Sequence, residues 1–400
     1  VKYIVMSENF IYLDHAAATP VDDKVLAAMT PYFSDKFFNP SAPYFPAIEV
    51  KHDYEDAKSQ LAQLIGAKSD ELVMTAGATE SVNLAFSAAN SSQDDSEILV
   101  GKFEHHSVLA AAKKFGKLVK INIKESGLID IEDLANKISP KTRIVSVMIA
   151  NNETGVIQPI TKIAELVRSE RQRRLSIGDS NPIYLHSDAS QGVGQLDIHV
   201  SRLGIDMITL NAGKIYGPKQ TGLLWADRNV SLVAQVVGGG QERNLRSGTE
   251  NVAAVIGFAK ALQLTEKHRK NENQRLKDLK QSFKKTLRSN FTETEMIFLG
   301  DEKKQLNSHI SLSFPGIDAE RIVFSLETNG VLLSTGSACA ANKASRSQTL
   351  CAMNLGEEVI DGSLRVSIGK LSNEDNMKQA AEIISQTVRD EINRIKGASA

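Results

Sequence analysis

The sequence has few cysteines and no long apolar run, and both shortages exclude classes of protein. Two of the 400 residues are cysteines, Cys339 and Cys351, which is too few for a disulfide framework or a recognisable zinc site. No apolar stretch approaches the roughly 20 residues that span a bilayer. The opening run 1–6 is also too short for the apolar core of a signal peptide. We therefore expect a soluble, cytoplasmic protein with no membrane contact and no bound metal.

An excess of charge of one sign is also missing. Lys and Arg total 47 and Asp and Glu total 48, so the formal net charge is -1. Nothing in this balance indicates direct binding of nucleic acid or of an anionic membrane. The chain shows no internal repeat and no low-complexity segment. Because 400 residues exceed the length at which a single core usually stops growing, we expect two domains.

Short apolar runs alternate with amphipathic stretches between about residues 46 and 260. Helices are predicted at 47–64, ended by Gly66, and at 107–115 and 160–174. This alternation is typical of an α/β domain whose mainly parallel sheet is covered by helices on both faces. The apolar runs predict strands at 71–75, 98–102, 118–123, 143–149, 183–186, 207–210 and 222–225.

The pattern changes after a long, charged, helix-favouring segment at 251–291, which we interpret as a connector between domains. We assign residues 21–260 to a large α/β domain, and residues 1–20 together with 261–400 to a small α+β domain. The small domain is indicated by shorter elements at 309–314, 322–328, 331–334 and 364–368 and by a final helix at 374–394.

The segment 75–81, Thr-Ala-Gly-Ala-Thr-Glu-Ser, lies where a predicted strand ends and a helix begins. Its small residues let backbone N–H groups converge on an anion, assisted by the helix dipole. It therefore indicates a phosphate-binding turn. A plain strand-to-helix turn has the same composition, so the segment alone does not decide between the two.

Asp188 and Lys214 follow two neighbouring predicted strands. Ligands of open α/β sheets bind at the carboxyl ends of the strands, so this carboxylate and this amine are expected to meet around one ligand. A buried carboxylate keeps a pyridinium nitrogen protonated, and a lysine forms a Schiff base with an aldehyde. These are the two requirements of pyridoxal 5′-phosphate (PLP).

Four further segments carry polar groups at strand ends or in flexible loops. His105 and Asn152 each follow a predicted strand, and they suit stacking on a heteroaromatic ring and hydrogen bonding to a carboxylate. A capping histidine and an Asx turn are the alternative interpretations. The loop segments 238–243 and 246–249 combine glycine, hydroxyls and arginine, which suits an anion or a mobile surface loop.

The second predicted domain contains a nucleophile and a cation. Cys339 stands in the small-residue stretch 334–341, and a thiol is a strong nucleophile even where only a small fraction is ionised. We interpret Cys351, in Leu-Cys-Ala-Met, as a small core residue. Arg365 lies on an apolar strand, where a carboxylate partner explains its burial; the alternative is an edge position with its head in solvent.

Taken together, these motifs resemble the cysteine desulfurases of the NifS/IscS type, in class V of the fold-type-I PLP-dependent transferases. The likeness runs from Tyr12-Leu13-Asp14-His15 to Arg365, and its segments agree in order. Besides those already described they include 77–81, 151–153, 188–191, 214–219, 246–249 and 336–339. The resemblance implies a large domain with a mainly parallel seven-stranded sheet and a smaller C-terminal domain.

The resemblance also assigns roles around PLP. Lys214 would bind the cofactor covalently, Asp188 would pair with the pyridinium, Gln191 would donate to the ring hydroxyl, and His105 would stack on the ring as acid and base. The remaining cofactor contacts fall on Gly77, Ala78, Thr79, Asn152, Asn211 and, from the second subunit of a homodimer, Thr249.

For the reaction, the resemblance implies that L-cysteine becomes L-alanine while Cys339 retains the sulfur as a persulfide. Asn152 and Arg365 would hold the substrate carboxylate, and Asn39 would also contact the substrate. The stretch after Cys339 is similar to the mobile-loop subgroup, whose partners are iron–sulfur scaffold proteins or acceptors in tRNA thiolation.

Two departures from the family pattern leave alternatives open. Asn211, Ala212 and Gly213 replace the usual serine or threonine, spacer and histidine before the lysine, and 42–44 lacks an expected histidine. The Asn211 amide is a substitute for the missing hydroxyl. A selenocysteine lyase or another PLP lyase, and a sulfur-relay or scaffold protein with a weakened active site, are the competing hypotheses.

Overall fold

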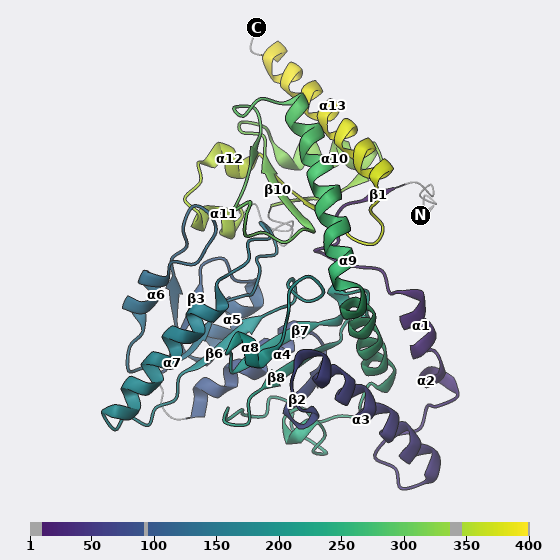
Figure 1. The fold of residues 1–400 in the computed structure, drawn as a ribbon, viewed down its shortest axis with the longest axis vertical. Helices are drawn as coiled ribbons and strands as arrows, with labels where there is room; N and C mark the ends of the chain where they lie inside the picture. Colours follow the sequence, from purple (N-terminus) through teal and green to yellow (C-terminus); the bar gives the residue numbers. More distant parts are fainter. Residues whose placement is uncertain (1–9, 92–94, 337–345, 399–400) are drawn as a thin grey trace.

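The computed structural model describes residues 10–91, 95–336 and 346–398. These residues form two layered units that are joined along one long helix (Figure 1). A seven-stranded sheet with its helices occupies one end of the molecule, and a smaller four-stranded sheet occupies the other. The α/β class and the two-sheet organisation predicted from the sequence are confirmed.

All seven predicted strands of the large sheet are present. They are parallel except β8, which runs antiparallel to both of its neighbours. The strands, from one edge to the other, are β2 (Leu72–Thr75), β8 (Gly222–Ala226), β7 (Met207–Asn211), β6 (Tyr184–Asp188), β5 (Thr142–Ser146), β3 (Glu97–Gly101) and β4 (Lys117–Ile121).

The inner strands are largely apolar because both faces of the sheet are buried there, whereas the edge strand β4 carries the exposed Lys117 and Lys120. Met74 and Leu99 belong to one hydrophobic cluster, whereas Val73, Ile98 and Val100 belong to another. Successive side chains of a strand point to opposite faces, so the two clusters lie on opposite sides of the sheet. This explains why the sequence shows continuous apolar runs and not an alternation of apolar and polar residues.

The helices that cover this sheet follow the predicted pattern closely. Helix α3 ends at Gly66, which adopts φ 71° and so takes the left-handed conformation that glycine allows. The helices of this domain are α1 (Asp23–Met29), α2 (Pro31–Ser34), α3 (Phe45–Ile65), α4 (Ala78–Phe86), α5 (His106–Phe115), α6 (Ile131–Lys137), α7 (Ile160–Ser176) and α8 (Val200–Leu203). Short 3-10 turns are η1 (Ser69–Glu71), η2 (Ser87–Ser91), η3 (Ala212–Lys214) and η4 (Glu242–Asn244).

Helix α9 (Val252–Asn290) connects the two units, as the charged segment predicted. Phe258, in its first half, packs in the core of the large sheet, whereas Phe283, in its second half, packs in the core of the small unit. Ile11 and Leu13 belong to the same small core, so the N-terminal strand joins the C-terminal unit. The domain boundary at residue 261 stays a prediction.

The small unit is an antiparallel sheet with helices packed against it. Its central strand β13 carries Arg365 and pairs with both β10 and β12. The strands are β9 (Ile297–Phe298), β10 (His309–Ser313), β12 (Ser334–Thr335) and β13 (Ser363–Ser367), with β1 (Ile11–Tyr12) paired to β11 (Val331–Leu332) beside them. The helices are α10 (Ala319–Thr328), α11 (Gln348–Ala352), α12 (Glu357–Asp361) and α13 (Glu374–Ala398).

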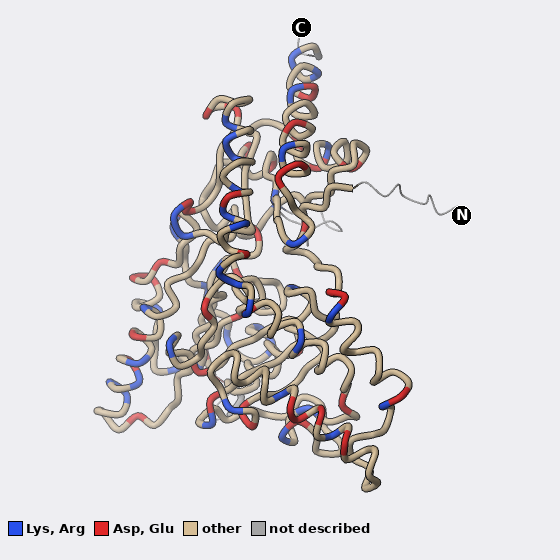
Figure 2. Tube along the Cα trace, turned by 45° about the vertical axis from the view of Figure 1, so that its right-hand side comes forward, with Lys and Arg blue, Asp and Glu red and all other residues tan. Residues whose placement is uncertain are grey.

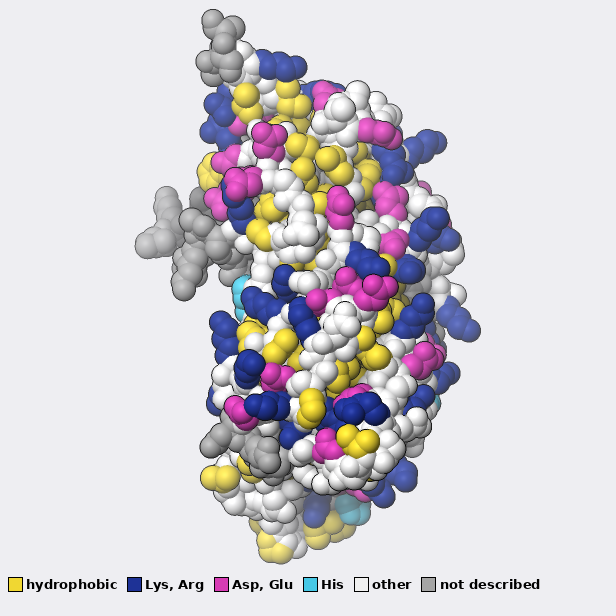
Figure 3. All heavy atoms as spheres, turned by 90° about the vertical axis from the view of Figure 1, so that its left-hand side faces the viewer, with side chains coloured by type: hydrophobic (Ala, Val, Ile, Leu, Met, Phe, Trp, Pro, Cys, Tyr) yellow, Lys and Arg dark blue, Asp and Glu magenta, His cyan; other side chains and the backbone are white. Residues whose placement is uncertain are grey.

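Charges of both signs are interspersed along the described part of the chain (Figure 2). The face at the left of Figure 1 likewise shows basic and acidic side chains with small apolar areas between them (Figure 3). None of the helices in the described part of the chain is long and apolar enough to cross a membrane.

Candidate active site

A cavity of about 270 Å³ lies at the carboxyl ends of the central strands and reaches the small domain. Asp188 is the last residue of β6, Asn211 is the last residue of β7, and Lys214 follows in η3. The structure therefore brings together residues that the sequence pattern placed at one sheet edge. Those that line the cavity are Ala78, Thr79, His105, Asn152, Asp188, Gln191, Asn211, Lys214 and Arg365.

Gly77 caps the N-terminus of α4 at one end of this cavity. Its φ of 123° is a conformation that only glycine adopts readily, and a Cβ there would meet no atom within 4 Å. The turn is therefore open, and Ala78 and Thr79 of the first helical turn face the cavity. Because the first turn of α4 lines the cavity and a helix N-terminus favours an anion, this position supports the anion-binding interpretation over a plain turn.

A carboxylate already lies at this turn. Glu80 accepts the N–H of Ala76 at 2.7 Å and pairs with Arg246 at 2.9 Å. The predicted loop 246–249 is thus linked to the turn within the same chain through Arg246. Thr249, by contrast, is exposed and does not line the cavity.

The cavity wall holds Asp188 and Lys214 in defined positions. One oxygen of Asp188 accepts the N–H of Ser190 at 2.9 Å. The Nζ of Lys214 donates to the carbonyl oxygens of Ala16 and Ala17 at 2.7 and 2.8 Å. The N-terminal segment therefore holds the lysine at the cavity, a role that the sequence pattern did not reveal because the two segments are far apart in the chain.

His105 caps helix α5 and is held by its own helix. Its Nδ1 accepts the N–H of Ser107 at 3.2 Å, so in the neutral ring the proton sits on Nε2. Burial lowers the pKa of His105, although the charge of Asp188 opposes that shift. The imidazole is accordingly neutral near pH 7, with its Nε2–H as a donor and its ring as a stacking surface.

Glu104, which the sequence pattern did not single out, is fully buried beside this histidine. Its Oε1 accepts the N–H of Met148 at 2.6 Å, and its Oε2 has no hydrogen-bond partner among the described residues. Burial raises the pKa of this carboxyl well above its ordinary value, with a smaller contribution from Asp188. Burial therefore favours the protonated form of Glu104, and the carboxyl fixes the backbone of Met148, which lines the cavity.

Arg365 is buried, so the edge-of-strand alternative is wrong. Its side chain is 4% exposed and pairs with Asp14 at 2.7 Å, and it also donates to the backbone oxygen of Asn152 at 3.3 Å. Its Nε has no partner among the described residues. A buried guanidinium with a donor unused indicates an anionic ligand at this wall, because an unsatisfied buried donor costs free energy.

Some predicted residues are not brought to this cavity. Asn39 lies in an exposed turn, where its Oδ1 accepts the N–H of Ser41 at 2.9 Å. Cys339 lies outside the described residues. The chain that flanks it is anchored: Gly336 donates to the backbone oxygen of Ser363 at 3.2 Å, and the hydroxyl of Ser347 donates to the buried carboxylate of Glu153.

The unusual stretch before Lys214 is well ordered without a histidine. The Oδ1 of Asn211 accepts the N–H of Gly213 at 3.0 Å, and the Gly213 oxygen accepts the hydroxyl of Thr19 at 3.1 Å. A Cβ on Gly213 would come no closer than 3.4 Å to any atom, so the glycine leaves room at this wall. Asn211 faces the cavity while it caps η3.

Two residues before Asp188, His186 supports the same strand and gives a pH-dependent prediction. Its nitrogens lie 2.8 Å from Ser146 Oγ and 3.0 Å from Thr209 Oγ1, and burial lowers its pKa from 6.5 to about 4. Below pH 6.5, His186 becomes protonated in the unfolded chain but stays neutral in the folded protein. The free energy of unfolding therefore falls by about 1.4 kcal/mol per pH unit from this residue until the pH reaches its folded pKa.

Between pH 6 and pH 4, replacing His186 with glutamine is expected to reduce the slope of the unfolding free energy against pH by about 1.4 kcal/mol per pH unit. Urea unfolding at a series of pH values measures the slope. The exposed His52, changed to glutamine, serves as the control and should leave the slope unaltered. An unchanged slope in the His186 variant would show that this imidazole titrates normally in the folded protein.

Comparison with known proteins agrees with this geometry. The family model of class-V aminotransferases matches residues 11–379. The chain is 35% identical over 380 residues to cysteine desulfurase IscS 1 of Archaeoglobus fulgidus, covering 93% of this chain and 95% of that protein. Among solved structures, a NifS-like protein superposes with a TM-score of 0.86 at 26% identity over 95% of this chain and 100% of its own.

A second solved structure, SspA in complex with cysteine, matches with a TM-score of 0.77 at 29% identity over 89% of this chain and 98% of its own. The family-model match covers most of the chain, and the relative above exceeds 30% identity over nearly its full length. The chain therefore belongs to the aminotransferase class-V family, alongside proteins named as IscS-type cysteine desulfurases.

Proposed function

We propose that this protein is a PLP-dependent cysteine desulfurase that converts L-cysteine to L-alanine and keeps the sulfur as a persulfide on Cys339. The observation that carries the proposal is a single cavity. It presents Asp188 and Lys214 from adjacent strand ends of one domain and the buried Arg365 from the other. The names of the relatives support the same activity.

The residues of the cavity fit PLP. Asp188 suits the ring nitrogen, Lys214 the aldehyde, and the open turn at Gly77 the phosphate. The buried hydroxyl of Ser190 has no partner among the described residues, so a polar group of a ligand would satisfy it. Gln191 reaches the same wall and donates to the backbone oxygen of Ala16 at 3.1 Å. When bound, PLP supplies an electron sink for chemistry next to the amino group of the substrate.

The protein's own groups would perform the remaining tasks. Arg365 and Asn152 bind the substrate carboxylate and orient the side chain toward Cys339. His105 would stack on the cofactor ring and hold a proton on Nε2 beside the reacting groups. The thiolate of Cys339 attacks the substrate sulfur: an S–S bond forms, the C–S bond breaks, and the carbon gains a proton, so that alanine leaves. The atoms balance as one thiol and one cysteine giving one persulfide and one alanine.

Arg365→Lys is expected to raise the KM for L-cysteine by about 10- to 100-fold with a smaller change in kcat. Lysine keeps the charge but loses the planar fork that grips a carboxylate with two hydrogen bonds. Steady-state alanine release measures both constants. The control is Arg321→Lys, because Arg321 pairs with Glu391 on the small domain, away from the cavity. An unaltered KM in the Arg365 variant would remove this residue from substrate binding.

We also propose a homodimer in which Asn39 and Thr249 act in the cavity of the partner subunit. Both residues are exposed, and neither lines the cavity of its own chain. The segment 31–45 around Asn39 presents a group of exposed aromatic rings, an arrangement that marks an interface in a protein of this kind. The rings are Phe33, Phe37, Tyr44 and Phe45.

Phe45→Asp is expected to shift the protein toward monomer, measured by sedimentation velocity, because a charge replaces one of the most exposed rings of this apolar surface. Phe324→Asp on α10 is the matched control, since Phe45 and Phe324 are each 71% exposed. Equal dimer fractions in the two variants would show that the 31–45 surface is not the interface.

The destination of the sulfur belongs to the same proposal. We infer that the persulfide passes to an iron–sulfur scaffold protein or to an acceptor in tRNA thiolation. The IscS name of the relatives favours the first. A cytoplasmic location remains the expectation from the low cysteine content.

A further inference from the structure

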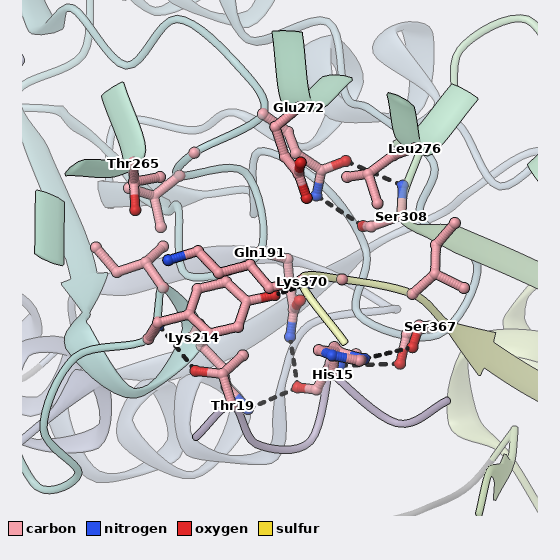
Figure 4. Close-up of a pocket in the computed structure, with 18 of the residues that line it drawn as sticks. His15, Thr19, Gln191, Lys214, Thr265, Glu272, Leu276, Ser308, Ser367 and Lys370 are labelled. Atoms are coloured by element: carbon pink, nitrogen blue, oxygen red, sulfur yellow. Dashed lines mark hydrogen bonds between the residues drawn. The ribbon is translucent and has the colours of Figure 1, made fainter. Parts of the chain in front are cut away.

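A second cavity, of about 340 Å³, lies between the two domains beside the candidate active site. Figure 4 shows side chains of α9, including Thr265, Glu272 and Leu276, on one side of it and His15 and Thr19 of the N-terminal segment on the other. Its size falls within the range of small-molecule sites. Nothing in the proposed desulfurase reaction uses it.

The two cavities share a wall. Ala16, Gln191 and Lys214 line both of them. Gln191 donates to the backbone oxygen of Ala16 at 3.1 Å, and Lys214 donates to the same oxygen at 2.7 Å. A molecule in the second cavity therefore contacts groups that also face the first one.

Of the charged residues that line this cavity, Glu272, Arg275 and Lys370 are in ion pairs, and Lys214 donates to carbonyl oxygens. Arg275 pairs with Glu272 at 2.7 Å and also donates to the backbone oxygen of Gly369 at 2.8 Å. Lys370 pairs with Asp22 at 2.7 Å. A charged ligand would bring an uncompensated charge into a partly desolvated space, which costs free energy. The wall therefore selects against a net charge on its occupant.

His15 presents an unsatisfied hydrogen-bond acceptor at this cavity. His15 is 6% exposed, and its Nδ1 lies 3.1 Å from the backbone oxygen of Ser367. A carbonyl only accepts, so Nδ1 carries the ring proton. The ring is neutral, because burial lowers its pKa. Nε2 is then a bare acceptor, and it has no partner among the described residues.

His309 presents an unsatisfied hydrogen-bond donor at the same cavity. Gln195 fixes Ser308, because its Oε1 accepts the Ser308 N–H at 3.0 Å and its Nε2 therefore donates to the Ser308 hydroxyl oxygen at 2.7 Å. The Ser308 hydroxyl hydrogen is left to bond with Nδ1 of His309, at 2.7 Å. Nε2 of His309 therefore carries the ring proton. His309 is 2% exposed, and this N–H has no partner among the described residues.

We propose that this interdomain cavity is a second ligand site, for a small uncharged molecule with an apolar body, one hydrogen-bond donor and one acceptor. His15 accepts from the donor and His309 donates to the acceptor. The apolar body contacts Val193, Ile215, Leu264, Leu276 and Ile368. Such a ligand touches both domains and the shared wall, so its binding changes the environment of Lys214.

Pyrazole is a suitable probe, because it is uncharged near pH 7, carries one N–H donor and one nitrogen acceptor, and has no amine that reacts with PLP. Binding to the PLP-loaded protein is measured by saturation-transfer NMR and located by soaking crystals. The expected result is pyrazole in this cavity. 1-Methylpyrazole, which lacks the donor, is expected to bind at least about fivefold more weakly.

Two variants separate this site from any other. His309→Leu removes the donor, and Leu264→Trp fills the cavity from α9; each is expected to weaken pyrazole binding at least fivefold. Leu175→Trp, at an exposed position on α7, is the control and should bind normally. Pyrazole binding that both cavity variants leave unaltered, or crystals that show only water in the cavity, would overturn the proposal.

The effect on Lys214 is tested separately, and this part alone rests on the proposed function. Saturating pyrazole is expected to shift the visible absorption band of the PLP-loaded protein, and Leu264→Trp is expected to remove the shift. Pyrazole bound in the cavity without a shift would refute the coupling while leaving the site. A protein that takes up no PLP but binds pyrazole would refute the proposed function and leave the site intact.

Discussion

Lys214→Ala is expected to abolish the visible absorption of the purified protein and to reduce alanine formation from L-cysteine by at least about three orders of magnitude. Lys214 is the amine that the structure places at the end of β7 beside Asp188, held by the carbonyl oxygens of Ala16 and Ala17. Alanine removes the covalent attachment point and keeps the surrounding wall. Absorbance spectra and an alanine assay on the same preparation measure both effects.

Lys219→Ala is the matched control, because Lys219 is exposed, lies five residues further along the chain and does not line the cavity. It should retain the spectrum and most of the activity. A Lys214 variant that kept both would remove this lysine from the chemistry. Circular dichroism of the two variants separates loss of chemistry from loss of fold.

Cys339→Ala is expected to abolish persulfide formation while the visible spectrum stays intact. The proposed reaction needs a thiol on the protein that takes up the substrate sulfur, and an alanine side chain has no thiol. The spectrum should survive because the groups proposed to hold PLP are Lys214, Asp188 and the turn at Gly77, which this substitution leaves in place. Persulfide is measured by mass spectrometry of the protein after incubation with L-cysteine.

Cys351→Ala is the control that the chain itself offers. Cys351 is exposed, so its interpretation as a small core residue is wrong. Partial desolvation still raises the pKa of its thiol, so little thiolate forms near neutral pH. The Cys351 variant should form persulfide at the normal rate. If persulfide still formed in Cys339→Ala but not in Cys351→Ala, Cys351 and not Cys339 would be the residue that receives the sulfur, and the proposal would be wrong.

The large sheet was predictable because its strands are buried on both faces. Runs such as 98–102 and 207–210 are mainly apolar, and this pattern locates strands without specifying partners. The run predicted at 143–149 is longer than β5, yet Val147 and Ile149 still donate to backbone oxygens of His186 and Asp188. The reversal of β8 is not encoded locally, because direction depends on the path of the connecting chain.

Much of the site was predictable for a topological reason. Polar residues that follow buried parallel strands gather at one edge of the sheet, so His105, Asn152, Asp188 and Lys214 were expected to meet, and they line one cavity. Contacts between distant segments were not predictable in this way. Asp14 pairs with Arg365, which lies 351 residues further along the chain, and no local sequence pattern predicts such a partner.

The altered stretch before Lys214 bears on the hypothesis of a weakened active site. The structure shows Asn211 capping η3, and Thr19 hydrogen bonded to Gly213, so the lysine is presented without the usual histidine. The cavity also keeps an acid, a base and a buried cation in place. This arrangement favours a working enzyme over a sulfur-relay protein that has lost its chemistry.

The most direct test of the desulfurase proposal is to supply the purified protein with PLP, add L-cysteine and a reductant, and quantify alanine and sulfide together. The account predicts both products in equal amounts, with repeated turnover, and none from the Lys214→Ala variant. A protein that shows the visible band of bound PLP yet releases no alanine from L-cysteine would contradict it.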